Sequence, residues 1–311
     1  MELIKTNKAK LPGHPKERIG QFRSASKADE TKRALSKNWN RFINWCQGKN
    51  LNPFPCSIET MESYLVFLAD EGLKASSIDQ AKWAIDSFHK LNGQTPPGIH
   101  ENIKVLLAGI KRTIGSRQIR KEAFTIEHIR KLIFRNDLIG IRDKALLLLG
   151  FAGGFRRSEL SGILIENIRF TDFGLVVHLD FSKTDQVGTG ADVEIVKAND
   201  SDYCPVLSVK NLIEKTGKHN GPLFYSVNRW NQPGNKLSTV TIGKLVKFYA
   251  AQCGLDPDKY GGHSLRSGCA TFLLDKGVSL NIVSKQGRWK RADTVLRYDR
   301  NQTSRALEGI Y

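Results

Sequence analysis

The side chains with the clearest chemical potential are a phenol, two arginines and a histidine in the second half of the chain. Tyr298 lies near the C-terminus, His263 and Arg266 precede it, and Arg156 with Glu159 follows an apolar run further upstream. A phenol can attack phosphorus, guanidinium groups bind phosphoryl oxygens through paired hydrogen bonds, and a histidine can transfer the proton. Their order suits attack on a phosphodiester and predicts a DNA strand-transfer enzyme.

Taken one at a time, these residues have ordinary structural roles. Arg156 and Glu159 are spaced to form an exposed ion pair on one helix face, and by pattern alone Arg157 competes with Arg156. His263 in isolation would more often be a surface histidine. A tyrosine whose pKa stays near 10 is protonated at neutral pH, so Tyr298 needs an activating environment to be a nucleophile.

Two more residues have ordinary structural interpretations as well. Lys183 stands at the end of a predicted strand, before a glycine-bearing turn, where a lysine usually only keeps a hairpin soluble. Trp289 lies nine residues before Tyr298 and is either a core residue or an N–H donor to a phosphate oxygen.

Composition favours a polyanionic partner and gives no sign of a metal or a membrane. The 311 residues include 48 Lys and Arg against 31 Asp and Glu, a net charge of +17 that attracts nucleic acid. The longest apolar run, residues 145–155, is shorter than the roughly 20 residues that cross a bilayer. The five cysteines show no C-x-x-C spacing, so we expect reduced thiols and neither disulfides nor zinc. No secretion signal is evident, and a cytoplasmic, DNA-associated protein is expected.

The pattern along the chain divides it into an arm, two domains and a linker. Residues 1–25 are basic and lack helical periodicity, which predicts a flexible arm. Residues 26–114 contain four amphipathic helical patterns, one of which begins at a capping Ser57, and predict a small all-α domain. Residues 115–122 form a basic linker, and residues 123–311 form a second domain with a C-terminal tail. The family resemblance stated below implies that the first is a helical core DNA-binding domain and the second is the catalytic domain.

The linker region is rich in positive charge without an apolar face. It is either a solvated connection or a segment lying along phosphates. The second interpretation assigns DNA binding to Lys111, Arg112, Arg117, Arg120 and Lys121.

The catalytic domain is predicted to be helical, with a small antiparallel sheet inserted among the helices. Helical periodicity resumes after a capping Thr125 and runs through the apolar segment 145–155. Residues 175–179 and 193–196 are strand-like, with turns before and between them. Helical patterns return at 206–215, 242–252, 264–276 and 279–286.

Taken together, the order Arg156 with Glu159, Lys183, His263 with Arg266, Trp289 and Tyr298 resembles the tyrosine recombinase (phage integrase) family, of the two-domain Cre-like and Xer-like kind. The resemblance covers essentially the whole chain. It implies a mainly α fold: a four-helix, SAM-like core-binding domain and an α-rich catalytic domain with a three-stranded antiparallel sheet.

The resemblance also implies a role for each residue. Arg156 is the first arginine, because it precedes Glu159 by the family's spacing, and Glu159 is the acidic supporting residue. Lys183 is the lysine of the strand hairpin, His263 and Arg266 are the histidine and second arginine, and Tyr298 is the nucleophile. Trp289 fits the position of histidine or tryptophan. One departure is that Arg288 separates Gly287 from Trp289, where many relatives have glycine directly before that position.

The implied function is site-specific recombination of double-stranded DNA through a 3′-phosphotyrosyl intermediate and a Holliday junction, without ATP, metal or other cofactor. Four protomers at synapsis are implied. The apolar residues after Tyr298 would pack on a neighbouring protomer or form a frayed end; they are Leu307, Ile310 and Tyr311. The alternatives are the same chemistry in a type IB topoisomerase or hairpin telomere resolvase, and a catalytically silent DNA-binding regulator.

Overall fold

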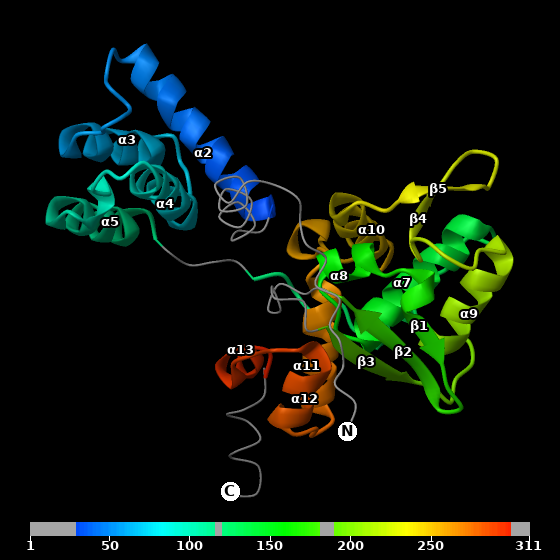
Figure 1. The fold of residues 1–311 in the computed structure, drawn as a ribbon. Coiled ribbons are helices and arrows are strands. Elements are labelled where there is room, and N and C mark those ends of the chain that lie inside the picture. Colours follow the sequence, from blue (N-terminus) through cyan, green and yellow to red (C-terminus); the bar gives the residue numbers. More distant parts are fainter. Residues whose placement is uncertain (1–28, 116–119, 181–189, 300–311) are drawn as a thin grey trace, which may run out of the picture. The chain divides into compact units, whose positions relative to one another are not determined.

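The computed structural model describes residues 29–115, 120–180 and 190–299 (Figure 1). The predicted arm, Arg117, Lys183 and the tail after residue 299 lie outside these ranges. The chain divides into two compact units, one ending at Gln118 and the other beginning at Ile119. The division falls within residues 115–122.

The first unit consists of helices around one apolar core. They are α2 (Asp29–Gly48), α3 (Ile58–Asp70), α4 (Ala75–Leu91) and α5 (Glu101–Ile114), with a 3-10 turn before α5. Helix α2 packs on α4, and α3 packs on α5. Each helix buries one stripe, and Trp39 of α2 stacks on Phe88 of α4 with their ring centroids 3.7 Å apart. The helical fold predicted for this part of the chain is therefore confirmed.

Helix ends in this unit follow the expected capping chemistry only in part. The Ser57 side chain accepts a hydrogen bond from the Thr60 amide and caps α3, as predicted. Helix α4, in contrast, begins at Ala75 after Lys74, whose side chain makes no capping bond. Tertiary packing of the apolar stripe therefore sets this end, since no capping side chain does.

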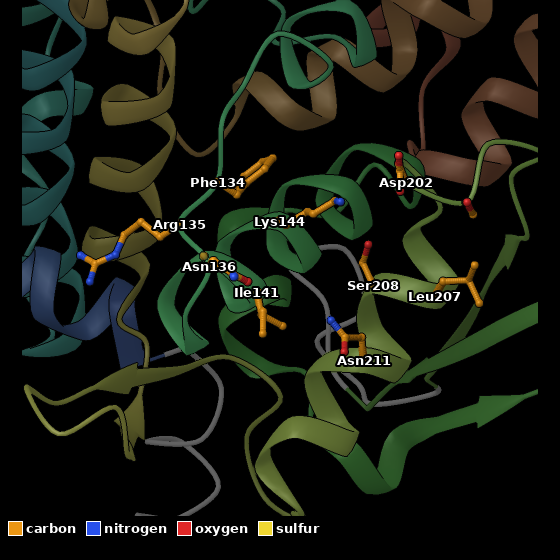
Figure 2. Close-up of a pocket in the computed structure, with 11 residues that line it drawn as sticks. Phe134, Arg135, Asn136, Ile141, Lys144, Asp202, Leu207, Ser208 and Asn211 are labelled. Carbon is orange, nitrogen blue, oxygen red and sulfur yellow. The ribbon is translucent and has the colours of Figure 1, made fainter.

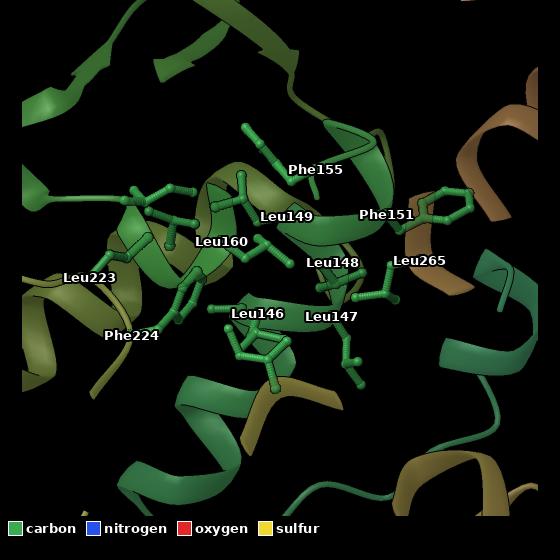
Figure 3. Packing of buried hydrophobic residues seen from close by; sticks show 14 of the residues in the cluster. Leu146, Leu147, Leu148, Leu149, Phe151, Phe155, Leu160, Leu223, Phe224 and Leu265 are labelled. Carbon is green, nitrogen blue, oxygen red and sulfur yellow. The ribbon is translucent and has the colours of Figure 1, made fainter. Parts of the chain in front are cut away.

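The second unit is built around a helix that is buried on nearly all sides, α7 (Leu138–Ala152). It packs against α9 (Pro205–Thr216) and α11 (Ser264–Asp275). Figure 3 shows the leucines of α7 interdigitating with side chains from neighbouring segments. A helix that is apolar all round needs such cover, which explains why the run at 145–155 contains so few polar residues.

A three-stranded antiparallel sheet in the order β1-β2-β3 lies at one side of this unit (Figure 1). The strands are β1 (Ile168–Phe170), β2 (Gly174–Leu179) and β3 (Ala191–Val196). In the central strand Val177 pairs with Ile168 on one side and Val193 on the other. Alternate residues of β2 and β3 are buried, as the strand-like patterns predicted.

The structure differs from the predicted helical run after Thr125. Thr125 does cap a helix, but α6 (Ile126–Ile129) has only four residues, and α7 begins anew at Leu138. The Asp137 side chain accepts a hydrogen bond from the Gly140 amide at 3.0 Å and starts α7. A single continuous helix is therefore wrong, because a second N-cap interrupts the periodicity.

Further helices and a hairpin complete the second unit. They are α8 (Arg157–Gly162), the hairpin β4 (Tyr225–Val227) and β5 (Pro233–Lys236), α10 (Thr239–Gln252), α12 (Leu280–Gly287) and α13 (Ala292–Leu296). Helices α11, α12 and α13 lie side by side in Figure 1 and share a small core. Within the described ranges, no helix combines the length and the apolar character needed to cross a bilayer.

Candidate active site

Helix ends and the segments beside them bring six predicted site residues toward one region of the second unit. Arg156 is the residue before α8, and Glu159 lies in the first turn of that helix. His263 precedes α11 and Arg266 lies in its first turn. The other two, Trp289 and Tyr298, follow α12 and α13. Their contacts, described below, connect all six.

Close backbone packing fixes the start of α11. The amide of Phe124 donates to the carbonyl oxygen of Ser264 at 2.9 Å, so the segment before α6 lies along this helix. A Cβ atom at Gly268 would come within 2.1 Å of the Phe124 carbonyl oxygen. The glycine therefore permits the close approach that places His263 and Arg266.

Tyr298 and His263 are hydrogen-bonded to each other. The hydroxyl oxygen of Tyr298 lies 2.9 Å from Nε2 of the exposed His263. The Tyr298 ring also lies 5.6 Å from the Trp289 ring, centroid to centroid. Burial raises the pKa of Tyr298 above its ordinary value, although the positive charges of Arg266 and Arg120 oppose that rise.

Glu159 is a buried carboxylate held by Arg156. Oε1 of Glu159 lies 2.5 Å from the Arg156 guanidinium, and Oε2 accepts the Arg156 backbone N–H at 2.8 Å. Burial works to raise the pKa of Glu159, but the charges of Arg288 and Arg156 outweigh it and the pKa is lowered. The ion pair is therefore not the exposed pair that the spacing alone allows.

Arg266 is buried rather than exposed, with only 1% of its surface accessible. Its Nη1 donates to the Gly154 carbonyl at 2.6 Å, and its guanidinium carbon lies 4.0 Å from the centroid of the Trp289 ring. Its Nη2 has no hydrogen-bond partner among the described residues. Burial, followed by repulsion from Arg156, lowers the pKa of Arg266 to about 9. A donor left unpaired in such a place costs about 1–3 kcal/mol and favours an anionic ligand.

Arg157 lies apart from the carboxylate. It is exposed, and its aliphatic stem covers Gly262, where an added Cβ would meet the Arg157 Cδ at 2.7 Å. Of these two adjacent arginines, Arg156 is the one whose side chain contacts Glu159. These contacts therefore favour Arg156 over Arg157 as the first arginine, which is the choice that the family spacing implied.

Arg288 is a residue of this cluster that the sequence did not single out as functional. Its guanidinium lies 2.8 Å from Oε2 of Glu159, opposite Arg156. Gly287, next to it, has no room for a side chain, because a Cβ there would lie 1.8 Å from the Trp289 ring. The only sequence signal was the unusual residue between Gly287 and Trp289.

The predicted DNA-binding residues that are described lie in both units. In the first unit, Lys111 forms an ion pair with Asp79 at 2.9 Å and Arg112 is exposed. In the second, Arg120 and Lys121 are exposed, and the Lys121 ammonium contacts the Asp258 carbonyl. Each unit therefore carries positive charge on its surface near the division of the chain.

The second unit also contains a cavity of about 460 Å³, whose lining residues are drawn in Figure 2. It is lined by the segments before α7 and α9 and by the first two turns of both helices, with Arg135, Lys144 and Asp202 among its polar residues. None of the six clustered residues lines it. In the described part of the chain, no three His, Cys, Asp or Glu side chains gather as a metal site would require.

Comparison with known proteins gives matches over most of the chain. Residues 122–305 match the phage integrase family. An integrase/recombinase XerD homolog from Selenomonas ruminantium is 34% identical over 280 residues, which cover 88% of this chain and 82% of the relative. The recombinase Cre of Escherichia phage P1 is 24% identical over 286 residues, which cover 84% and 80%.

Solved structures share the fold at low identity. The Tn1549 transposon integrase, in complex with transposon right-end DNA, gives a TM-score of 0.60 at 15% identity and covers 93% of this chain and 96% of its own. A lambda integrase dimer bound to a COC′ core site gives 0.59 at 16% identity, covering 92% and 95%. With the family match over more than half of its length, the chain belongs to the phage integrase family of tyrosine recombinases.

Proposed function

We propose that this protein is a site-specific DNA recombinase that cleaves and rejoins DNA through a phosphodiester bond to Tyr298. The observation that carries the proposal is the 2.9 Å contact between the Tyr298 hydroxyl and Nε2 of His263, in the same cluster as the unpaired Nη2 of buried Arg266. A nucleophile, a base and an oxyanion donor are the parts that phosphoryl transfer needs. The DNA complexes of the structural relatives support the choice of substrate.

In the cleavage step, the Tyr298 oxygen attacks phosphorus and its proton passes to Nε2 of His263. Arg156 and Arg266 bind the non-bridging oxygens, on which negative charge accumulates, and the Trp289 indole N–H is a further donor. The bond from phosphorus to the 5′ oxygen breaks, and Lys183 protonates that oxygen. The bond energy stays in the phosphotyrosyl ester, so the reverse attack by a 5′ hydroxyl reseals a strand without ATP.

Glu159 supports this arrangement without touching the phosphate. It closes the first turn of α8 and, itself buried, fixes the guanidinium of Arg156. Two sequential strand exchanges, each by two of four protomers, would pass through a Holliday junction. The basic segment with Lys111, Arg112, Arg117, Arg120 and Lys121 would bind the phosphate backbone around the cleavage site.

The test is covalent trapping on a nicked DNA duplex taken from the region flanking the native gene. Wild-type protein should form an adduct that survives denaturing gel electrophoresis and leaves a free 5′ hydroxyl. Tyr298→Phe should bind the duplex with unchanged affinity and form no adduct, because only the attacking oxygen is missing. A persistent adduct in Tyr298→Phe would exclude Tyr298 as the nucleophile.

Two controls sharpen this experiment. Tyr203→Phe removes a hydroxyl that donates to the Arg130 carbonyl at 3.0 Å, outside the cluster, and should keep full adduct formation. Strand exchange between two labelled duplexes then separates recombination from topoisomerase or resolvase chemistry. Relaxation of supercoils without exchange would contradict the recombinase.

A further inference from the structure

Arg288 adopts a backbone conformation that usually belongs to glycine. It ends α12 with φ 57° and ψ 45°, in the left-handed region. A side chain other than glycine, asparagine or aspartate at such a position costs about 1 kcal/mol or more. The arginine must therefore supply interactions that glycine could not.

Those interactions tie the end of α12 to the loop before α8. The Arg288 guanidinium donates to the carbonyl oxygens of Gly153 at 3.2 Å and Gln286 at 2.8 Å, and it pairs with Glu159 at 2.8 Å. It also lies over the Phe155 ring, 5.0 Å from the centroid. Only 11% of the side chain is exposed, so little of the interaction is screened by solvent.

Glu159 thereby becomes a bridge between two arginines. Its Oε1 binds Arg156 and its Oε2 binds Arg288, while its own side chain is 1% exposed. Nη2 of Arg156 in turn donates to the Arg288 carbonyl at 3.3 Å. The next residue after Arg288 is Trp289, whose ring covers the Arg266 guanidinium. The positions of three proposed phosphate donors thus meet at Arg288.

We propose that Arg288 is a positioning residue for DNA cleavage: it orients Arg156 through Glu159 and orients Trp289 by anchoring the end of α12 to the loop before α8. The proposal rests on the function proposed above. Both Nη atoms of Arg288 are directed to Glu159 and to backbone carbonyls, and its buried Nε has no hydrogen-bond partner among the described residues, so we assign Arg288 no contact with the phosphate. Its loss should lower the rate of the chemical step and leave DNA affinity unchanged.

The variant Arg288→Gly suits the left-handed backbone and removes only the side chain. On the nicked duplex at saturating protein, we expect adduct formation to slow by about 10- to 100-fold, since a displacement of about 1 Å at a reacting site can cost a hundredfold. DNA affinity should change less than about twofold, because the variant keeps every side chain that binds phosphate. Arg288→Lys keeps the charge but not the planar fork, and its rate should fall between those of Arg288→Gly and wild type.

The pH profile separates positioning from general structural damage. The charged and titratable groups around Glu159 are Arg156 before α8, Arg266 and Cys269 on α11, and Arg288 after α12. Arg288 lowers the pKa of Glu159, so Arg288→Gly should raise it. Protonation of the base His263 slows both proteins alike, so the readout is the ratio of the two rates: as the pH is lowered toward the raised pKa of Glu159, its carboxyl holds Arg156 less firmly and the deficit of Arg288→Gly relative to wild type should grow. A merely less stable fold, compared at pH values where both proteins remain folded, would show a constant deficit.

The outcomes are distinguishable. If wild type forms no adduct, the proposed function fails. If wild type forms an adduct and Arg288→Gly matches its rate and pH profile, the positioning role is overturned. Arg291→Gly, which removes an exposed arginine that pairs with Asp293, should behave as wild type. If thermal unfolding shows that Arg288→Gly is not folded, Arg288→Lys decides: a slower rate supports the role and a wild-type rate refutes it.

Discussion

The hydroxyl of Tyr298 and Nε2 of His263 lie 2.9 Å apart, although the two residues are 35 positions apart in the sequence. The pair joins the start of α11 to the segment after α13 within one chain. Burial raises the pKa of Tyr298, so the phenolate is scarce at neutral pH and a neighbouring base is needed. His263 is the side chain placed to accept the proton.

This arrangement predicts how cleavage by His263→Ala depends on pH. At neutral pH the variant should form adduct about 10²- to 10⁴-fold more slowly than wild type, the usual contribution of a positioned base. Its rate should then rise about tenfold per pH unit between about pH 7 and 9, because the phenolate fraction grows below the raised pKa of Tyr298. Single-turnover adduct formation on a nicked duplex measures both quantities.

The control for this series is His219→Ala, an exposed histidine outside the cluster. Its rate and profile should match those of wild type. A His263→Ala rate that does not change with pH would show that proton removal from Tyr298 is not the role of His263.

A second prediction concerns the two adjacent arginines before α8. Arg156→Ala should reduce cleavage by a factor that corresponds to about 3–4 kcal/mol, as for removal of a donor to a developing oxyanion. Arg266→Ala should reduce it by a similar amount. Arg157→Ala should retain full activity, because its side chain lies over Gly262 and not against Glu159. An essential Arg157 with a dispensable Arg156 would shift the assignment by one residue.

Much of the fold could be predicted because its helices are amphipathic and their ends carry recognisable caps. Ser57 and Thr125 were predicted as caps and are caps. The break at Asp137 was missed, because the apolar residues on both sides of it continue a helical spacing. The hairpin of β4 and β5 was missed too, since Pro233 and Gly234 interrupt any alternation of apolar and polar residues.

The site was predicted from residue types and their order, but its internal geometry was not. Arg288 contacts Glu159, which lies 129 positions earlier, and no local pattern encodes such a distance. Similarly, no pattern in the sequence indicated that Arg266 is buried beneath Trp289. Sequence periodicity shows which face of a helix is apolar; it does not show that a charged residue is covered by a segment from elsewhere in the chain.

The third prediction concerns the salt dependence of DNA binding. Replacing the five basic residues 111, 112, 117, 120 and 121 by glutamine should flatten the plot of log affinity against log salt. The plot has a negative slope. For every phosphate that the variant no longer neutralises, this slope should become less steep by nearly one unit, because one fewer counterion is released on binding. Deleting residues 1–25 should do the same. Lys210→Gln, on the exposed face of α9 beside Glu214, is the control and should leave the slope unchanged. An unchanged slope in the first two variants would mean that both segments are simply solvated.

The last prediction tests Lys183, which lies outside the described residues. If Lys183 protonates the departing 5′ oxygen, Lys183→Ala should cleave ordinary DNA very slowly, because an alkoxide is a poor leaving group. With sulfur in place of the bridging 5′ oxygen, the leaving group is a thiolate that needs no proton at neutral pH, so cleavage by Lys183→Ala should be largely restored. The same substrate should rescue Arg156→Ala far less, because the proposed role of Arg156 concerns the non-bridging oxygens. Equal rescue of both variants, or wild-type cleavage of ordinary DNA by Lys183→Ala, would remove Lys183 from the mechanism and require another proton donor.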